Sequence, residues 1–318
     1  MILTERMKED IFSQAEQSII QYLFEEREKI KSKTLNQISK ETYTHPSTGI
    51  RIAKKLGYDG WLELKDHYLE EVEYLNRHYE SIDANFPFDA SDNNMSISHK
   101  LARLNQTTID DTVHLIDHQE LDKAVAYLNE AETIKIFGLY HNLMICEDFE
   151  MRMNQIGKTV KLCALEPHFE IEKSSKHTCA IFISYSGENQ SILKLLPMLK
   201  KKHIPIIGLT RIGENTVTKY ADSILRISTR EKLYSKISNF TTRDSISFLM
   251  DILYACVYGT DYDKHTDYKI NIAKNFDNRV THNKMIQENK GLTIILNNMG
   301  FKSVIIYVIT RELCKCNL

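Results

Sequence analysis

The pattern of hydrophobic and polar positions divides the chain into two parts. Between residues 10 and 79, apolar residues recur every three or four positions and polar stretches interrupt them, which is typical of consecutive short helices. From about residue 132, short β-branched runs alternate with segments of helix length. These strand candidates are TIKIFGL, TVKLC, CAIFISYS, IPIIGLT and SILRIS. Such alternation predicts a parallel sheet with helices on both faces.

The fold class that follows is α/β, with an all-α domain before an α/β domain. The segment SIDANFPFDASDNNMSIS is rich in Asp, Asn and Ser and therefore predicts a linker. The expected domains are residues 1–80 and 99–284, with the linker at residues 81–98. The last strong helical pattern is DSISFLMDILYACVYG, and residues 285–318 form an apolar, strand-like tail that fits neither domain.

Composition and charge narrow the class of protein. The 318-residue chain is 42% hydrophobic and 26% charged, as in ordinary soluble proteins, and its formal net charge of −2 means that nucleic-acid binding would need a local basic patch. The N-terminus lacks a signal-peptide pattern and the apolar run Val304–Ile309 is too short to span a bilayer, so we expect a cytoplasmic protein with no membrane partner. The six scattered cysteines form no C-x-x-C pair, so we expect reduced thiols, no metal site and no cofactor.

Residues 34–65 have the pattern of two short helices joined by a tight turn, which predicts a helix-turn-helix. Thr34 is placed to cap the first helix, Pro46 to begin the second and Gly57 to follow its end. Five basic and three acidic residues make the segment locally basic. The alternative is that AKKLG is only the solvated end of a packing helix.

The segment TYTHPSTGIRIAKKLGYDGWLELK resembles the N-terminal helix-turn-helix of the RpiR/MurR family of bacterial regulators. We expect Arg51 to meet a guanine edge of operator DNA, and the residues at the helix N-terminus to meet phosphates or bases. The expected DNA-binding residues are His45, Ser47, Thr48, Arg51, Lys54 and Lys55.

Two positions depart from that family's pattern. His45 stands where the family usually has a capping serine, and Gly49 replaces a β-branched residue expected to pack between the helices. A glycine inside a helix costs about 1 kcal/mol relative to alanine. We therefore expect a less stable module, or one that binds DNA more weakly.

The stretch FISYSGENQS runs from a strand candidate through a turn into a helical pattern. Unpaired N–H groups at such a helix start favour an anion, the hydroxyls of Ser184 and Ser186 add donors, and Gly187 lets the backbone approach a ligand. The surrounding segment CAIFISYSGENQSILKLLPMLKKKHIPIIGLT resembles the central βαβ unit of a SIS (sugar isomerase) domain. With the first resemblance, it covers the chain to about residue 284.

The resemblance implies that a phosphorylated sugar binds here as an effector. Asn142 replaces a serine of the family pattern, and Asn189 replaces a serine or threonine. Tyr140 replaces a glycine and is expected to narrow the pocket or to shift the ligand preference. Glu231 is interpreted as a remnant base or a contact to a ligand hydroxyl, with a solvated loop acid as the alternative. The expected effector-binding residues are Asn142, Ser184, Ser186, Gly187, Asn189 and Glu231.

The leading hypothesis is a transcriptional regulator of carbohydrate metabolism, not an enzyme, that works as a homodimer or homotetramer. Helix-turn-helix readers pair to meet two half-sites of an operator. A sugar-phosphate isomerase is the alternative, but His141 and Glu231 are its only base candidates and no catalytic residue is assigned. A third hypothesis is an interaction protein with a degenerate pocket. The sequence identifies neither the effector nor the operator, nor whether the protein activates or represses.

Overall fold

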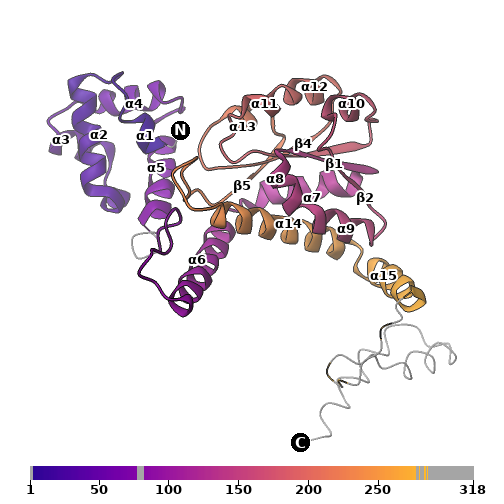
Figure 1. Ribbon diagram of the computed structural model, residues 1–318. Coiled ribbons are helices and arrows are strands. Elements are labelled where there is room, and N and C mark those ends of the chain that lie inside the picture. Colours follow the sequence, from indigo (N-terminus) through magenta and orange to yellow (C-terminus); the bar gives the residue numbers. More distant parts are fainter. Residues whose placement is uncertain (1–2, 77–81, 277–278, 280–282, 284, 286–318) are drawn as a thin grey trace, which may run out of the picture. The chain divides into compact units, whose positions relative to one another are not determined.

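The computed structural model describes residues 3–76 and 82–276, together with residues 279, 283 and 285 (Figure 1). The first of two compact units extends to Tyr268. The expected C-terminal tail therefore lies outside the described residues, except for Met285. None of the described helices combines the length and the apolar character needed to cross a bilayer.

The N-terminal domain is entirely helical, as the periodicity predicts. The polar stretch that interrupts the first amphipathic pattern is a 3-10 helix. Thr34 accepts a hydrogen bond from the N–H of Gln37, Pro46 is the first residue of its helix, and Gly57 has a φ of +88° just after that helix, so these three predictions are confirmed. The elements are α1 (Leu3–Arg6), α2 (Gln14–Glu26), η1 (Arg27–Ser32), α3 (Leu35–Glu41), α4 (Pro46–Lys55) and α5 (Trp61–Asn76).

Gly49 lies in α4 where this helix packs closely against Leu35 and Trp61. A Cβ atom at this position would overlap the Leu35 side chain and lie 2.9 Å from Cε3 of Trp61. The glycine thus leaves no gap, because Leu35 and Trp61 fill the place of the missing side chain. Its effect on stability and DNA affinity stays a prediction.

The second domain is built on a five-stranded parallel sheet with the order β2-β1-β3-β4-β5. Every strand candidate in the sequence contributes one strand, which confirms the predicted sheet. The strands are β1 (Thr133–Gly138), β2 (Thr159–Leu162), β3 (Thr178–Ile183), β4 (Ile206–Thr210) and β5 (Ser223–Arg226).

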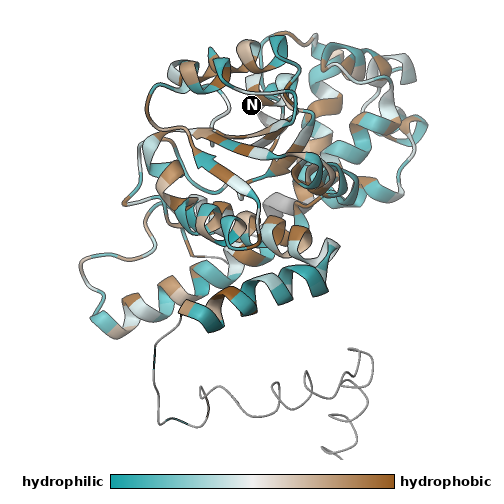
Figure 2. Cartoon of the chain, turned by 90° about the vertical axis from the view of Figure 1, so that its right-hand side faces the viewer, coloured by the Kyte–Doolittle hydropathy of each residue, from teal (hydrophilic) through white to brown (hydrophobic). Residues whose placement is uncertain are grey.

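Helices cover both faces of this sheet (Figure 1). Along β3, Cys179, Ile181 and Ile183 pack into one core cluster while Ala180 and Phe182 pack into the other, as the period of two in a strand requires. Brown and teal residues alternate along the helices in Figure 2, because each helix buries only one side. One layer contains α7 (His118–Glu130), α8 (Tyr140–Ile145), α9 (Glu147–Asn154) and α14 (Phe240–Thr260). The other contains α10 (Pro167–Glu172), α11 (Gln190–Leu193), α12 (Leu195–Lys201) and α13 (Thr216–Tyr220).

Two helices differ from the sequence-based expectation. Helix α6 (Asn94–His114) begins inside the range predicted as linker, because the Asn93 side chain caps it by accepting from the N–H of Ser96. Helix α15 (Tyr262–Phe276) follows α14, so the prediction that DSISFLMDILYACVYG is the last helix is wrong. His265 is the one buried residue of α15, so the helix has no apolar stripe from which the sequence could have predicted it.

Candidate DNA interface and effector crevice

The outward face of α4 carries the candidate DNA contacts. Four of its residues are exposed, namely Ser47, Ile50, Arg51 and Lys54. The last three follow Ser47 by three, four and seven positions, so all four lie on one side of the helix. The opposite side is buried in the N-terminal domain. The helix therefore presents these four residues to solvent as a mixed polar, basic and apolar strip, called here the outward strip of α4.

His45 caps the N-terminus of this helix. Its Nδ1 atom accepts a hydrogen bond from the N–H of Ser47 at 3.2 Å and lies 2.9 Å from the Ser47 hydroxyl. The imidazole thus does what a serine side chain does at the same position in the family pattern. The ring remains exposed next to Ser47, where a phosphate could approach both.

Thr48 is almost completely buried, with 2% of its surface exposed. Its hydroxyl accepts a hydrogen bond from Nη2 of Arg51 at 3.2 Å, one helical turn further on. This places Thr48 behind the outward strip and Arg51 on it. Thr48 is therefore arranged to orient the guanidinium of Arg51.

The two lysines at the end of α4 have different surroundings. Lys54 has 60% of its side chain exposed and lies 3.8 Å from the Asp59 carboxylate. Lys55 donates to the buried carboxylate of Glu16 at 2.7 Å and to the carbonyl of Ile11 at 3.0 Å. Lys54 is thus available to a partner, whereas Lys55 holds α4 against α2.

Glu16 shows how this ion pair affects protonation. Burial alone would raise the pKa of Glu16, but the hydrogen bonds from Lys55 and from the backbone and hydroxyl of Ser13 outweigh burial and lower it. Glu16 is therefore held as a carboxylate inside the N-terminal domain.

Two apolar residues near the outward strip were not among the expected contacts. Ile50 is 46% exposed between Ser47 and Arg51, and Tyr43 is 97% exposed in the turn before α4. The helical spacing of Ile50 from Ser47 and Lys54 was a signal available in the sequence. The exposure of Tyr43 had no such signal, because it depends on the left-handed backbone (φ +52°) of the turn.

The candidate effector site lies where the order of the strands reverses. After β1 the chain returns on one side as β2, and after β3 it returns on the other side as β4, so the loops after β1 and β3 diverge. Ligands of open parallel sheets bind at such a switch point, outside the carboxyl ends of the strands. Gly138 ends β1 opposite Ile183, and a Cβ on Gly138 would lie 3.1 Å from the Ile183 carbonyl.

Asn142 lies beside this point in the first turn of α8. It is 3% exposed, and its Oδ1 atom is buried without a hydrogen-bond partner among the residues that the structure describes. A Cβ on Gly138 would lie 3.7 Å from the Asn142 Cβ, which places Asn142 next to the strand pair that leads into Ser184. A buried acceptor without a partner costs about 1–3 kcal/mol, so this oxygen is a strong candidate to accept from a ligand.

The turn after β3 is held by its own backbone and by the loop after β4. The N–H of Gly187 donates to the carbonyl of Ser184 at 3.1 Å, and the N–H of Glu188 donates to the Ser186 hydroxyl at 3.2 Å. Gly187 has a φ of +70°, and a Cβ there would overlap the side chain of Asn215. The fold therefore requires glycine here whether or not a ligand approaches its backbone.

Asn189 caps the helix that follows the turn. Its Oδ1 atom accepts from the N–H of Ser191 at 3.0 Å, and α11 has only four residues before α12 begins at Leu195. A helix this short has a weak dipole, so the hydroxyls and the local charge matter more for anion binding than the sequence pattern implied. Arg211, which sequence reasoning did not single out, donates from Nε to the carbonyl of Ser186 at 3.2 Å.

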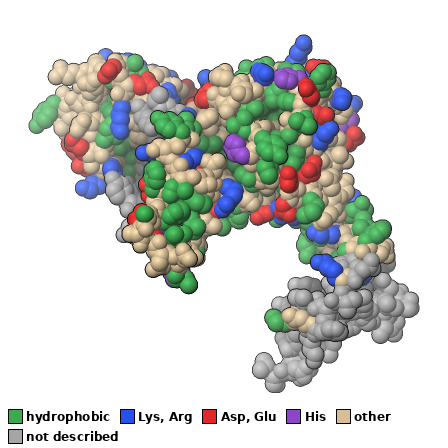
Figure 3. Space-filling view, in the orientation of Figure 1, with side chains coloured by type: hydrophobic (Ala, Val, Ile, Leu, Met, Phe, Trp, Pro, Cys, Tyr) green, Lys and Arg blue, Asp and Glu red, His purple; other side chains and the backbone are tan. Residues whose placement is uncertain are grey.

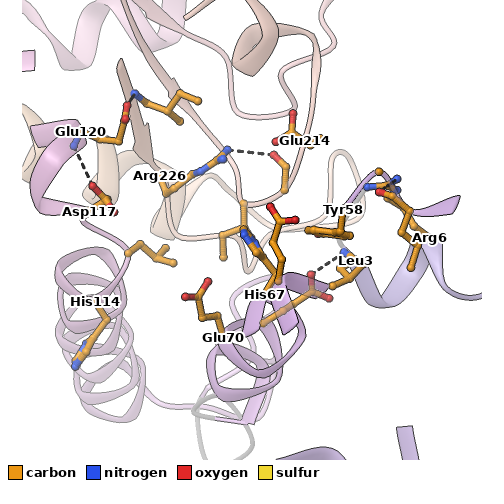
Figure 4. A pocket seen from close by; sticks show the side chains of 18 of the residues that line it. Leu3, Arg6, Tyr58, His67, Glu70, His114, Asp117, Glu120, Glu214 and Arg226 are labelled. Carbon is orange, nitrogen blue, oxygen red and sulfur yellow. Dashed lines mark hydrogen bonds between the residues drawn. The ribbon is translucent and has the colours of Figure 1, made fainter. Parts of the chain in front are cut away.

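The loop after β4 that carries Arg211 and Asn215 is itself anchored (Figure 4). Arg226, at the end of β5, donates from Nη1 to the carbonyls of Arg211 at 3.0 Å and Gly213 at 3.1 Å. Glu120 on α7 accepts from the N–H of Ile224 at 2.8 Å. These contacts fix the loop that flanks the turn after β3.

Glu231 is buried, so the alternative of a solvated loop acid is wrong. Its side chain is fully enclosed and its two oxygens accept five hydrogen bonds. The donors are the backbone N–H groups and hydroxyls of Thr241 and Thr242, at 2.6–3.1 Å, and the Lys236 ammonium at 2.9 Å. Glu231 therefore fixes the loop 229–239 to the first turn of α14.

The first two residues of α8 face solvent. Tyr140 is 70% exposed, and His141 is also exposed. Cys146, whose thiol donates to the Asn142 carbonyl at 3.3 Å, is buried, and burial raises the pKa of this thiol to about 12. This cysteine is thus not an activated nucleophile.

Both parts of the chain match family models. A helix-turn-helix domain of the rpiR family matches residues 3–73, and a SIS domain matches residues 127–250. The HTH-type transcriptional regulator YbbH of Bacillus subtilis (strain 168) is 27% identical over 258 residues, which cover 80% of this chain and 89% of YbbH.

A second regulator and one solved structure extend the comparison. The HTH-type transcriptional regulator TTE0211 of Caldanaerobacter subterraneus subsp. tengcongensis is 24% identical over 276 residues, which cover 86% of this chain and 95% of that protein. The Vibrio vulnificus NanR protein complexed with ManNAc-6P has a TM-score of 0.52 at 19% identity and covers 86% of this chain and 97% of its own. At that identity the structural likeness shows the fold alone.

Proposed function

Because the chain belongs to the RpiR family of helix-turn-helix transcriptional regulators with a SIS domain, we propose that α4 binds operator DNA and that a phosphorylated sugar controls this binding. The effector occupies the crevice at the carboxyl ends of β1 and β3. The observation that carries the effector part is the buried, unpartnered Oδ1 atom of Asn142 beside the turn that follows β3. A regulator of this kind changes its DNA affinity when the effector favours one of two arrangements.

The DNA contacts come from the outward strip of α4. Arg51, oriented by Thr48, meets a guanine edge, and Lys54 meets a phosphate. Ser47 and the His45 ring meet a phosphate at the helix N-terminus. Lys55 acts indirectly, by holding the helix in place through Glu16. We add Ile50, whose exposed side chain suits the methyl group of a thymine.

Within the effector crevice, the turn of Ser184, Ser186 and Gly187 holds the phosphate, and Asn189 shapes the helix start behind it. Arg211 adds a positive charge next to Ser186. The Asn142 oxygen accepts from a sugar hydroxyl, because sugars supply the donors that a buried amide oxygen lacks. NanR, which shares the fold, is complexed with a phosphorylated sugar, and this agrees with the ligand class.

A mobility-shift titration tests both parts. The duplex is selected by the wild-type protein from a random library, and glucose 6-phosphate, fructose 6-phosphate, ribose 5-phosphate and ManNAc-6P are added in turn. Arg51→Ala is expected to weaken specific binding about 10–100-fold, the effect of losing one bidentate base contact. Ser184→Ala with Ser186→Ala should keep DNA binding and lose the response to sugar phosphate.

The matched control is Ser174→Ala with Ser175→Ala, two serines just before β3 at the opposite end of the sheet. This control should respond like the wild type. A Ser184, Ser186 double variant that also responds like the wild type would contradict the effector site. Failure of the wild-type protein to select any duplex would contradict the DNA-binding part.

An isomerase is disfavoured by the site. The relatives YbbH and TTE0211 are transcriptional regulators. Both oxygens of Glu231 are engaged by α14 and Lys236, and His141 is exposed on α8, so these two residues do not form a poised acid–base pair. An aldose–ketose exchange assay with the same four sugar phosphates should show no turnover, and turnover that Glu231→Gln abolishes would reverse this conclusion. Calorimetry without any sugar-phosphate binding would favour a pure interaction protein.

Self-association is part of the proposal. Figure 3 shows hydrophobic side chains over α6, where Met95, Ile109 and Val113 are exposed. Ile109 follows Met95 by fourteen positions and Val113 follows Ile109 by four, so the three residues lie on one side of the helix. An exposed apolar strip suits contact with a second copy of the chain. Sedimentation should therefore detect a dimer or tetramer that Val113→Glu weakens.

A further inference from the structure

The effector turn is the turn of residues 184–187 that follows β3. The loop 229–239, between β5 and α14, contacts the effector turn on one side and the segment before α6 on the other. From these contacts we propose that Tyr185 is a positioning residue that couples effector binding to the linker, through the backbone of this loop and the side chain of Asn85. The inference rests on the proposed function, and it concerns how the same site is regulated.

Tyr185 stands between Ser184 and Ser186 in the effector turn. Its hydroxyl donates to the carbonyl of Glu231 at 2.7 Å and accepts from the N–H of the same residue at 3.1 Å. The Lys236 ammonium lies 5.6 Å from the centre of the ring. Because the hydroxyl donates to the carbonyl and accepts from the N–H of one residue, a displacement of the turn is transmitted directly to the backbone on both sides of Glu231.

Asn85 holds the same loop from the linker side. Its Oδ1 atom accepts from the N–H of Lys232 at 2.7 Å, and its backbone carbonyl accepts from the N–H of Ile237 at 2.9 Å. Its Nδ2 group also donates to the carbonyl of Arg230 at 3.4 Å. Asn85 is 8% exposed, so these contacts are shielded from water. The linker is thus fastened to residues on both sides of Glu231 in the sequence.

Arg230 provides a second set of hydrogen bonds between the loop and the linker. Nη2 donates to the carbonyl of Ile82 at 2.9 Å, and Nη1 donates to the hydroxyl of Thr107 on α6 at 2.8 Å. The buried carboxylate of Asp111 lies 3.6 Å from Nη1. The loop therefore contacts the described chain at Ile82, where it resumes after the N-terminal domain, and at α6, where the linker ends.

These contacts give a physical order of events. A phosphate that draws the turn inward moves the Tyr185 hydroxyl, and the peptide of Glu231 follows. The Glu231 carboxylate stays fixed on α14, so the loop rotates about that anchor and shifts the N–H of Lys232 against Asn85. The linker then changes position, and the DNA-binding domain is attached to the linker. A two-state element biased by both sites is what coupling between them requires.

Tyr185→Phe tests this relay because it removes one oxygen atom and keeps the ring. DNA affinity is measured with and without each of the four sugar phosphates, and sugar-phosphate affinity is measured by calorimetry. We expect both separate affinities to stay within about 3-fold of wild type, whereas the effector-induced change in DNA affinity falls toward none. Coupling is reciprocal, so DNA should also stop changing the affinity for the sugar phosphate.

Asn85→Ala, at the other end of the relay, should give the same separation of binding from response. Tyr220→Phe is the control, since this ring packs in the helix layer that contains α12 and not against the loop. A full response in both Tyr185→Phe and Asn85→Ala would overturn the relay alone. A wild-type protein that binds DNA but responds to none of the four sugar phosphates would overturn the proposed effector as well.

Discussion

The outward strip of α4 and the effector turn were both identified by short motifs, yet their residues have different surroundings in the structure. On α4, Arg51 and Lys54 face solvent, as helical spacing alone predicts. In and beside the turn after β3, Asn189 caps a helix, Gly187 accommodates Asn215 and Glu231 is enclosed by its contacts with α14 and Lys236. A regular helix fixes which side faces out, because its geometry is local. The orientation of a loop side chain depends on partners far away in the sequence, and a motif does not contain them.

The largest effect expected from this difference is at Gly187. Gly187→Ala should lower the free energy of unfolding by about 3 kcal/mol, from about 1–2 kcal/mol for alanine at positive φ and about 1–3 kcal/mol for overlap with Asn215. Gly157→Ala is the control, because Gly157 has a φ of +85° but open space around it. It should lose only about 1 kcal/mol.

Urea unfolding followed by far-UV circular dichroism provides both values. The overlap can be tested by repeating Gly187→Ala in the Asn215→Ala background. The extra loss should shrink there, because the Cγ and Oδ1 atoms at 2.1 Å are removed, but it should not vanish, because the Asn215 Cβ at 2.7 Å remains. Equal losses for Gly187→Ala and Gly157→Ala would mean that the turn is set by local backbone geometry alone. The contrast between the effector turn and α4 would then be much weaker.

The next effect separates the two lysines of α4. Lys55→Met should lower the free energy of unfolding of the N-terminal domain by about 2 kcal/mol, because it removes a charged hydrogen bond from the buried Glu16. Lys54→Met should change stability by less than about 0.5 kcal/mol. It should instead weaken DNA binding uniformly across sequences and reduce the salt dependence by about one counterion.

Trp61 is the only tryptophan of the chain and lies in the core of the N-terminal domain, so its fluorescence reports the unfolding of that domain. The DNA part is measured as the slope of log affinity against log salt. If Lys55→Met left stability unchanged and lowered the salt slope, Lys55 would belong to the DNA contacts. The outward strip would then be wider than the structure indicates.

The smallest effect is a pH dependence. The folded-state pKa of Glu16 lies below its ordinary value, so its contribution to stability is present above the unfolded pKa and is lost as pH falls through the folded pKa. Trp61 fluorescence in urea should therefore show the N-terminal domain losing stability as pH is lowered below about 4.5. Glu16→Gln should reduce this loss, whereas Glu25→Gln, an exposed acid on the same helix, should leave it unchanged. If Glu16→Gln lost as much stability at low pH as the wild type, other carboxylates would be responsible for the pH dependence.

The elements differ in how well the sequence announced them. The five strands were found because β-branched runs bounded by polar segments are a strong local signal, and Thr34, Pro46 and Gly57 carry their caps within a few residues. Helix α15 was missed because it buries little of its surface, and the start of α6 was missed because its Asn93 cap resembles the linker around it. Signals of this kind are weak wherever burial is slight or a polar cap stands in a polar segment.

The sequence by itself therefore determined the fold class, the order of the elements and the outward strip of α4. Periodicity and capping act over a few residues, so they can be recognised without knowing the fold. Only the tertiary structure decided that Lys55 meets Glu16, 39 residues away, and that Asn85 meets Lys232, 147 residues away. It also decided that the Asn142 oxygen is buried and has no hydrogen-bond partner in the described part of the chain. Hydrogen-bond partners of buried polar groups are chosen by packing between distant segments, and that choice separates residues that hold the structure from those left to bind a ligand.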